Sequence, residues 1–286
     1  MEALSQFLDK VDGLIWGAPL LIALIAVGIL LTVKLRLIQV SNLILSLKLV
    51  FSSKANADDS SKAGDISGFA ALCTALASTI GTGNIVGVAT AVHMGGPGAL
   101  FWMFVAAFFG MATKYSECLL AVKYREVDEK GRYRGGPMYY IKNGLHCKSL
   151  AALFALLTVG AGCFGIGTYC QVNSMVDANR IMFGMSPLAS CAIISALVGM
   201  VTVGGLNSIS RVSTKLIPLM AVFYIVGCLF VILVNIESLP SAVVLIVKSA
   251  FNFDAGVGAA TGIGILMAMR FGVARGMFSN EAGLGS

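Results

Sequence analysis

Long uncharged runs, separated by shorter basic stretches, make up most of the chain. The runs lie at residues 14–33, 66–92, 98–122, 150–176, 188–205, 216–236 and 256–286. Each can supply the roughly 20 helical residues that cross a bilayer core. In hydrocarbon, backbone N–H and C=O groups must be paired within the segment, and the alternating ten-residue strands of a membrane barrel are absent. The pattern therefore predicts an all-α, polytopic protein with seven candidate spans in a lipid bilayer.

Composition agrees with this prediction. Of the 286 residues, 57% are hydrophobic and 12% are charged, whereas a soluble domain carries about 25% charged residues. The first residues, MEALSQFLDKVDG, hold three acidic side chains against one lysine. Because a cleavable signal begins with positive charge, the first span is predicted to be retained.

Basic residues predict the orientation. Of the twenty Lys and Arg residues, fourteen lie in alternate loops, at 34–65, 123–149 and 206–215. The loops on the other side hold Lys10, Arg180 and Lys248. By the positive-inside rule, the side with fourteen is cytoplasmic, and the N-terminus lies outside the cell (inner) membrane. Topology thus explains the net charge of +6, and no nucleic-acid partner is predicted.

The residue patterns of common enzymes and metal centres are missing. Neither H-E-x-x-H nor G-x-S-x-G occurs, and both histidines fall outside the predicted spans. The seven cysteines form no C-x-x-C pair. We therefore expect neither an enzyme nor a protein with an organic cofactor.

The stretch STIGTGNIVG, residues 78–87, places three glycines inside an uncharged run. A dinucleotide-binding loop would need a preceding strand and an acidic residue about twenty positions on, but FWMFVAAFFG stands there. Two membrane interpretations remain. In one, the small residues Ala77, Gly81, Gly83 and Gly87 allow two helices to pack closely. In the other, the glycines break the helix, and its exposed ends present N–H groups to a carboxylate and carbonyls to a cation.

The last run contains a second set of interruptions. It has six glycines between residues 261 and 286, together with Arg270, Arg275, Asn280 and Glu281. Charged residues inside a span usually mark a substrate path, an ion site or a gate. Alternatively, Arg275 and Glu281 are partners at a helix end near water. Transporters built from inverted repeats break a helix at matching positions in both halves, so a second break here would strengthen the broken-helix interpretation of residues 78–87.

Three phrases resemble the sodium:alanine symporters, the alanine or glycine:cation symporter family. They are ISGFAALCTALASTIGTGNIVGVATAVHMGGPGALFWMFVAAFFGMATKYSECLLAVKYR, GRYRGGPMYYI and RGMFSNEAGLGS. The resemblance implies a LeuT-like fold with five-plus-five inverted repeats, preceded here by one extra helix. It also implies a secondary symporter that imports a small neutral amino acid, alanine or glycine, with sodium as the coupling ion.

The resemblance also implies roles for particular residues. Backbone N–H groups of Thr82, Gly83 and Asn84 would hold the substrate carboxylate, and Gln171 would reach across to it; alternatively, Gln171 makes a helix-to-helix hydrogen bond. Met269, Phe271, Gly272 and Gly276 would line the break in the sixth core helix. Sodium would bind the carbonyls of Ala77 and Ile80, and a second position would use Thr79 and the Asn84 side chain.

Three further segments carry expectations. Glu117 is a candidate gating or proton-binding group, like Arg275, Asn280 and Glu281, but an ion pair with Lys114 at spacing i, i+3 is favoured. Residues 132–145 are predicted to form a cytoplasmic loop with an interfacial helix. The apolar part of 238–252 is too short to span, which predicts a re-entrant or interfacial helix at the outer face.

These expectations give a division of the chain. Residues 1–65 would hold the extra helix and a cytoplasmic link, 66–236 the first five-helix repeat, and 237–286 an outer segment and the broken first helix of an incomplete second repeat. A fragment truncated there is not expected to transport by itself. The alternatives are an ion channel and a symporter for another small amino acid or driven by protons.

Overall fold

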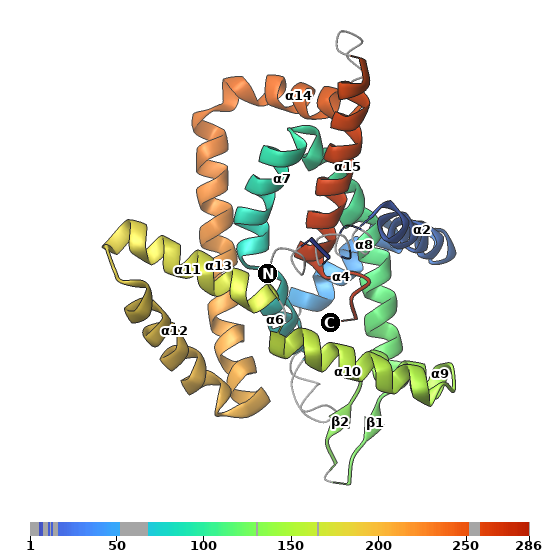
Figure 1. Cartoon of the computed structure of the whole chain (residues 1–286). Helices are drawn as coiled ribbons and strands as arrows, with labels where there is room; N and C mark the ends of the chain where they lie inside the picture. Colours follow the sequence, from blue (N-terminus) through green and yellow to red (C-terminus); the bar gives the residue numbers. More distant parts are fainter. Residues whose placement is uncertain are drawn as a thin grey trace. The chain divides into compact units, whose positions relative to one another are not determined.

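The computed structural model describes residues 6–7, 11, 13, 17–51, 68–129, 131–164, 166–251 and 258–285 (Figure 1). Residues 52–65 of the predicted cytoplasmic link, including Lys54 and Lys62, lie outside the described residues. The helices are α2 (Ala18–Lys34), α3 (Ile38–Ser41), α4 (Leu43–Phe51), α6 (Gly68–Thr79), α7 (Val88–Gly95), α8 (Gly98–Lys123), α9 (Pro137–Gly144), α10 (Lys148–Phe164), α11 (Ile166–Phe183), α12 (Pro187–Thr202), α13 (Gly205–Val234), α14 (Leu239–Phe251) and α15 (Gly258–Asn280). The shorter elements are the π-helical turn η2 (Gly83–Gly87), the 3-10 turn η3 (Ile236–Ser238) and the strands β1 (Glu126–Val127) and β2 (Tyr133–Arg134).

Apolar helices dominate the described residues, as expected for a membrane protein, but fewer of them reach spanning length than the sequence predicts. Gly98–Lys123 and Gly205–Val234 are long and apolar enough to cross a membrane. So is Lys148–Phe183, which comprises α10, α11 and residue 165 outside the described residues, and one bent pair makes up to four. The predicted spans 14–33 and 188–205 correspond to shorter apolar helices, Pro19–Lys34 and Pro187–Thr202. Among the described residues, three or four segments thus reach spanning length where the sequence predicts seven, and parts of the predicted spans at 14–16, 66–67 and 256–257 lie outside the described residues.

Two loops predicted on the cytoplasmic side contain regular structure. Residues 206–215, predicted as a loop, form the first turns of α13, a helix of 30 residues in total that ends at Val234. This stretch contains no proline before Pro218, so no residue in it lacks the backbone N–H that a helix needs. Its polar residues can therefore form helical turns ahead of the apolar run. The other loop contains the antiparallel pair β1–β2, a small exception to the all-α prediction.

The chain divides into two compact units. Unit 1 comprises Met1–Leu43, Gly87–Glu117 and Leu229–Ser286. Its core contains Leu21 of α2, Ala106 of α8, and Val273 and Met277 of α15. In this unit α15 packs against α7, α14 and α2 (Figure 1). Because α15 contacts helices from distant parts of the chain, it organises the packing of unit 1.

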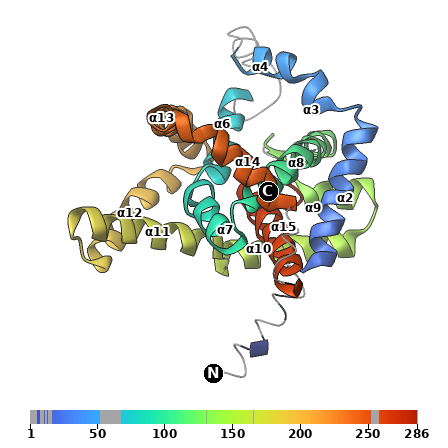
Figure 2. The ribbon, with the colours of Figure 1, turned by 90° about the horizontal axis from the view of Figure 1, so that it is seen from above.

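Unit 2 comprises Ile44–Val86 and Cys118–Cys228. Helices α11 and α12 lie side by side in both views (Figures 1 and 2), and α9 contacts α10. The helix predicted within residues 132–145 is present as α9, which follows the β1–β2 hairpin. Lys142 and Asn143 of α9 donate hydrogen bonds to Glu126 Oε1 on β1. These hydrogen bonds link the helix to the hairpin. Because they stabilise the charged carboxylate, they also hold the pKa of Glu126 below its usual value.

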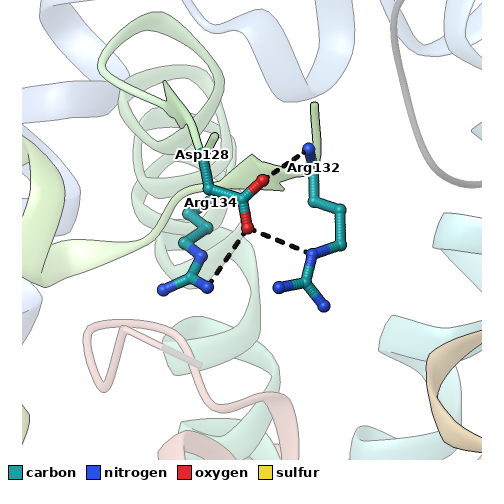
Figure 3. A network of polar contacts seen from close by, with 3 residues as sticks. All are labelled: Asp128, Arg132 and Arg134. Atoms are coloured by element: carbon teal, nitrogen blue, oxygen red, sulfur yellow. Dashed lines mark hydrogen bonds and ion pairs between the residues drawn. The ribbon is translucent and has the colours of Figure 1, made fainter. Parts of the chain in front are cut away.

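The hairpin turn is fixed by one carboxylate. Asp128 Oδ1 accepts a hydrogen bond from the backbone N–H of Arg132, and Oδ2 accepts from the guanidinium groups of Arg132, 3.0 Å, and Arg134, 3.2 Å (Figure 3). Both arginine side chains are more than half exposed. Exposed ion pairs contribute little to stability, so the network mainly shapes the turn.

Candidate functional site

The predicted break in the first glycine-rich run is present. Helix α6 ends at Thr79, and the helical segment Gly83–Gly95 that follows is bent by 52° from it. The second segment opens with the π-helical turn η2, a distortion that occurs frequently at functional sites. The helix is therefore not continuous through this stretch. A helix interrupted inside an apolar run exposes backbone polar groups at both new ends.

Asn84 spans the break. Its side-chain Nδ2 donates to the carbonyl oxygen of Thr79 at 2.9 Å, and its backbone N–H donates to the carbonyl of Gly81 at 3.1 Å. The Tyr224 hydroxyl lies 3.5 Å from the Asn84 carbonyl oxygen, a long hydrogen bond from α13. Asn84 thus satisfies two carbonyl groups that the interruption releases.

The break also refines the predicted carboxylate cradle of Thr82, Gly83 and Asn84. The backbone N–H of Asn84 already has the Gly81 carbonyl as its acceptor. At the start of a helical segment the first N–H groups have no carbonyl of their own helix to bind. Thr82 and Gly83 stand at this start. Their N–H groups are therefore the stronger candidates to bind an anion.

Gln171 of α11 lies against this break. A Cβ placed on Gly81 would come within 3.6 Å of Gln171 Nε2 and 3.9 Å of Oε1, so the amide and the glycine are near neighbours in unit 2. The side chain of Gln171 is exposed rather than packed in the core. Asn173, two residues on, instead hydrogen-bonds Asp177 of the same helix. The structure therefore brings together Gln171 and the glycine-rich break, which are 90 residues apart in the sequence.

The predicted sodium ligands cluster around the end of α6. Ala77, Thr79 and Ile80 are half-buried there. The Thr79 hydroxyl donates to the carbonyls of Ala75 and Leu76, at 3.4 and 3.3 Å, which leaves its oxygen lone pairs able to accept a cation. Hydroxyl and carbonyl oxygens are suitable ligands for a small hard cation such as sodium. The donor types thus fit the prediction.

The second predicted break is misplaced. Met269, Phe271, Gly272 and Gly276 lie inside α15, which is a continuous helix from Gly258 to Asn280. The two glycines serve close packing in unit 1. A Cβ on Gly272 would lie 2.4 Å from the Ala99 carbonyl oxygen, and one on Gly276 would lie 3.3 Å from Ala106 Cβ. The regular helix ends only after Asn280, in a turn over residues 281–285.

Glu117 has partners that its spacing on the helix does not suggest. Besides the charge interaction with Lys114 expected at spacing i, i+3, Oε1 of Glu117 accepts hydrogen bonds from the backbone N–H groups of Gly283, at 3.1 Å, and Gly285, at 3.2 Å. Glycines alternating with other residues at 283–285 were the only local signal of such a turn. A contact across 166 residues leaves no trace in helical periodicity.

Of the other residues predicted for gating, Asn280 and Glu281 belong to this turn or contact it. Asn280 Oδ1 accepts a hydrogen bond from the backbone N–H of Ala282 at 2.9 Å. Glu281 adopts a left-handed backbone with φ 51°, and Arg275 is half-buried on α15. The structure therefore brings Glu117, Asn280 and the turn together within unit 1, whereas the residues of the break near Gly81 belong to unit 2.

Comparison with known proteins gives one family. The model of the "Sodium:alanine symporter family" matches residues 1–286. An "Uncharacterized transporter" of Haemophilus influenzae is 50% identical over 283 residues, which is 99% of this chain and 61% of the relative. "Sodium/alanine symporter AgcS" of Methanococcus maripaludis is 46% identical over 98% of this chain and 61% of the relative.

A third relative differs in the substrate of its name. "Probable sodium/glutamine symporter GlnT" of Bacillus subtilis is 38% identical over 99% of this chain and 58% of the relative. The chain thus spans about three fifths of the length of the curated relatives that it matches. Each of these three relatives is named as a transporter or symporter.

Proposed function

The chain belongs to the sodium:alanine symporter family, as its motifs predict, and on this premise we propose that it serves the sodium-coupled import of a small neutral amino acid, alanine or glycine, by alternating access. Because the family is one of transporters, the chain is not an enzyme. The relatives named as sodium/alanine and sodium/glutamine symporters support an amino acid and sodium as the ligands.

The observation that carries this proposal is the interrupted helix with the Gln171 amide beside it. The carboxylate of the amino acid would bind the N–H groups of Thr82 and Gly83, where a helix start favours an anion. Gln171 would donate a further hydrogen bond to that carboxylate. Sodium would bind the carbonyls of Ala77 and Ile80 at the other end of the break, with a second position at Thr79 and the Asn84 side chain. Opposite charges of ion and carboxylate at one interruption would couple their binding.

The proposal includes the architecture and location. We place α2 as the extra helix before a LeuT-like first repeat that begins at α6. Its membrane is the cell (inner) membrane, with the N-terminus outside, on the basis of the basic loops. An interrupted helix that begins at α6, after the apolar helix α2 and the shorter helices α3 and α4, supports this arrangement.

Binding measurements test the proposal against its competitors. We expect the purified protein in detergent to bind alanine in sodium but not in potassium buffer, as measured by titration calorimetry. Binding that follows pH and ignores sodium would favour a proton-driven symporter, and preference for glutamine would correct the substrate. Single-channel currents in planar bilayers without saturable amino-acid binding would favour the ion channel and overturn the proposal.

Replacement of Gln171 gives a sharper test. We expect Gln171→Ala to weaken alanine binding by about 1 to 3 kcal/mol, because a charged carboxylate loses one hydrogen bond. Sodium affinity without alanine should stay unchanged, since the proposed ion ligands lie between Ala77 and Asn84 and none is on α11. Asn173→Ala is the matched control, because its side chain bonds Asp177 on its own helix. Calorimetry of both ligands decides: equal losses for alanine and sodium, or no loss for either, would contradict a direct contact.

A further inference from the structure

A cavity of about 550 Å³, here named the hairpin pocket, opens within unit 2. Residues 132–134 line it from the β1–β2 hairpin, and residues 204–207 line it from the start of α13. Its volume falls in the range of about 300 to 1,000 Å³ that is usual for small-molecule sites. None of the residues proposed for alanine or sodium lines it. The hairpin pocket is therefore a second candidate site in the same unit.

Two arginines make the hairpin pocket basic. Arg132 and Arg134 both line it, and none of the described residues that line it is acidic. Arg132 uses Nε, and Arg134 uses Nη2, to donate to Oδ2 of Asp128 (Figure 3). A guanidinium group carries five N–H donors, so each arginine keeps donors beyond the one used on Asp128. One carboxylate balances only one of the two positive charges, which leaves charge for a ligand.

The hairpin also holds these cationic groups in place. Asp128 bonds both guanidinium groups and, through Oδ1, the backbone N–H of Arg132. Tyr133 lines the pocket between them in sequence, and the guanidinium group of Arg125 lies over its ring at 4.3 Å from the centroid. Groups that are held before a ligand arrives lose less conformational entropy when it binds. The pocket wall is thus preorganised for an anion.

The start of α13 supplies backbone donors on the other wall. The first N–H groups of a helix have no acceptor within it and lie at the positive end of its dipole. Helix α13 begins at Gly205, and Leu206 and Asn207 follow in its first turn. A Cβ on Gly205 meets no atom of the described residues within 4 Å, so the backbone there is uncovered. The fold thus adds N–H donors to a cavity that the arginines already make basic.

A phosphate monoester matches these donors better than a carboxylate does. It carries about −1.5 to −2 charges at pH 7 and three acceptor oxygens, whereas a carboxylate has one charge and two oxygens. The planar fork of arginine fits phosphate oxygens in pairs. Tyr133 and Leu206 add an aromatic ring and an apolar side chain to the lining. The cavity can therefore hold a small organic group beside the phosphate.

We propose that the hairpin pocket binds the phosphate group of a phosphate monoester at the cytoplasmic face. Only the choice of face rests on the proposed function, through its orientation of the basic loops. Gly205 precedes the apolar run that starts at residue 216 by about 16 Å of helix, so the pocket lies outside the hydrocarbon. A small phosphorylated molecule in solution and a lipid headgroup that ends in a phosphate monoester offer the same chemistry there.

Glycerol phosphate is the soluble probe, measured by titration calorimetry on the purified protein in neutral detergent. We expect saturable binding that weakens about tenfold in Arg132→Gln and in Arg134→Gln, since each loses charge-assisted hydrogen bonds. Lys148→Gln is the matched control, because Lys148 is exposed in the same predicted cytoplasmic segment and does not line the pocket. Its affinity should stay within about threefold, the effect of an exposed charge elsewhere. Equal losses in all three variants would mean general attraction to positive charge and would overturn the pocket.

Leu206 tests the wall formed by α13. Leu206→Glu places a carboxylate in the pocket opposite the arginines, whereas Leu206→Gln has the same size without the charge. Both should fold, because Leu206 is half exposed and an acidic residue is favourable in the first turn of a helix. We expect Leu206→Glu to abolish glycerol phosphate binding and Leu206→Gln to retain it. Unchanged binding in Leu206→Glu would place the ligand elsewhere and overturn the proposal.

Phosphatidic acid separates the lipid source from the soluble one. Its headgroup is a phosphate monoester, whereas phosphatidylserine is an anionic lipid with a phosphodiester. Native mass spectrometry of the protein with each lipid should show preferential retention of phosphatidic acid, lost in Arg134→Gln, if the ligand is a headgroup. Glycerol phosphate binding with equal retention of the two lipids would support a soluble ligand. Arginine-dependent binding of neither probe would overturn the proposal. Because neither experiment uses alanine or sodium, this failure is distinct from a failure of the proposed function.

Discussion

Gly272→Val is expected to lower the free energy of unfolding by about 3 kcal/mol, the upper part of the range for overpacked cores. A Cβ at this position would lie 2.4 Å from the Ala99 carbonyl oxygen and 2.8 Å from Trp102 Cβ. Because the first of these atoms belongs to the backbone of α8, no side-chain rotation relieves the clash. The two helices must separate, and the core around Val273 loses its packing.

The same helix provides a matched control. A Cβ on Gly264 meets no atom of the described residues within 4 Å, so Gly264→Val introduces the same side chain on α15 without a clash among them. We expect it to change stability by less than about 0.5 kcal/mol, as for most surface substitutions. Unfolding in sodium dodecyl sulfate, followed by circular dichroism, gives both values. Equal stability of the two variants would show that α8 and α15 do not pack through Gly272.

Asn84→Ala is expected to weaken sodium-dependent alanine binding by about 3 kcal/mol, more than a hundredfold, because two interactions of about 1 to 2 kcal/mol each are lost. The amide that bridges to the Thr79 carbonyl disappears, and so does the side-chain oxygen proposed for sodium. Both losses fall at the interruption itself. Titration calorimetry over a series of sodium concentrations should show a lower alanine affinity and a weaker dependence on sodium.

Asn235 provides the control for this substitution. Its Nδ2 donates to the carbonyl of Val231 at 2.9 Å, the same type of bond that Asn84 makes to Thr79, but at the end of α13. Asn235→Ala should therefore leave alanine binding unchanged. If Asn84→Ala binds alanine with unaltered sodium dependence, Asn84 is a helix cap without a role in ion binding. Asn84→Asp keeps a side-chain oxygen and loses the amide donor. The sodium dependence of its alanine binding would therefore separate the hydrogen bond to Thr79 from a contact with the ion.

The sequence by itself determined the family, the membrane class and the position of the break at Gly81. These features depend on local properties. An uncharged run of 20 residues requires a helix in lipid wherever it packs, and clustered glycines weaken a helix whatever surrounds it. The short helix predicted within 238–252 is present as α14 for the same reason, since its apolar run has a definite length.

Tertiary structure decided the partners of these elements. The glycines of α15 predicted a second break. At Gly272, however, α8 lies so close that only a residue without a Cβ fits, although glycine by itself weakens a helix. Gln171 meets Gly81, and Glu117 meets Gly283, across 90 and 166 residues. Helical periodicity reports only neighbours three or four residues apart, because the backbone bonds that create it reach no further. Contacts between distant helices depend on side-chain shape at the packed interface, and only the folded chain supplies that shape.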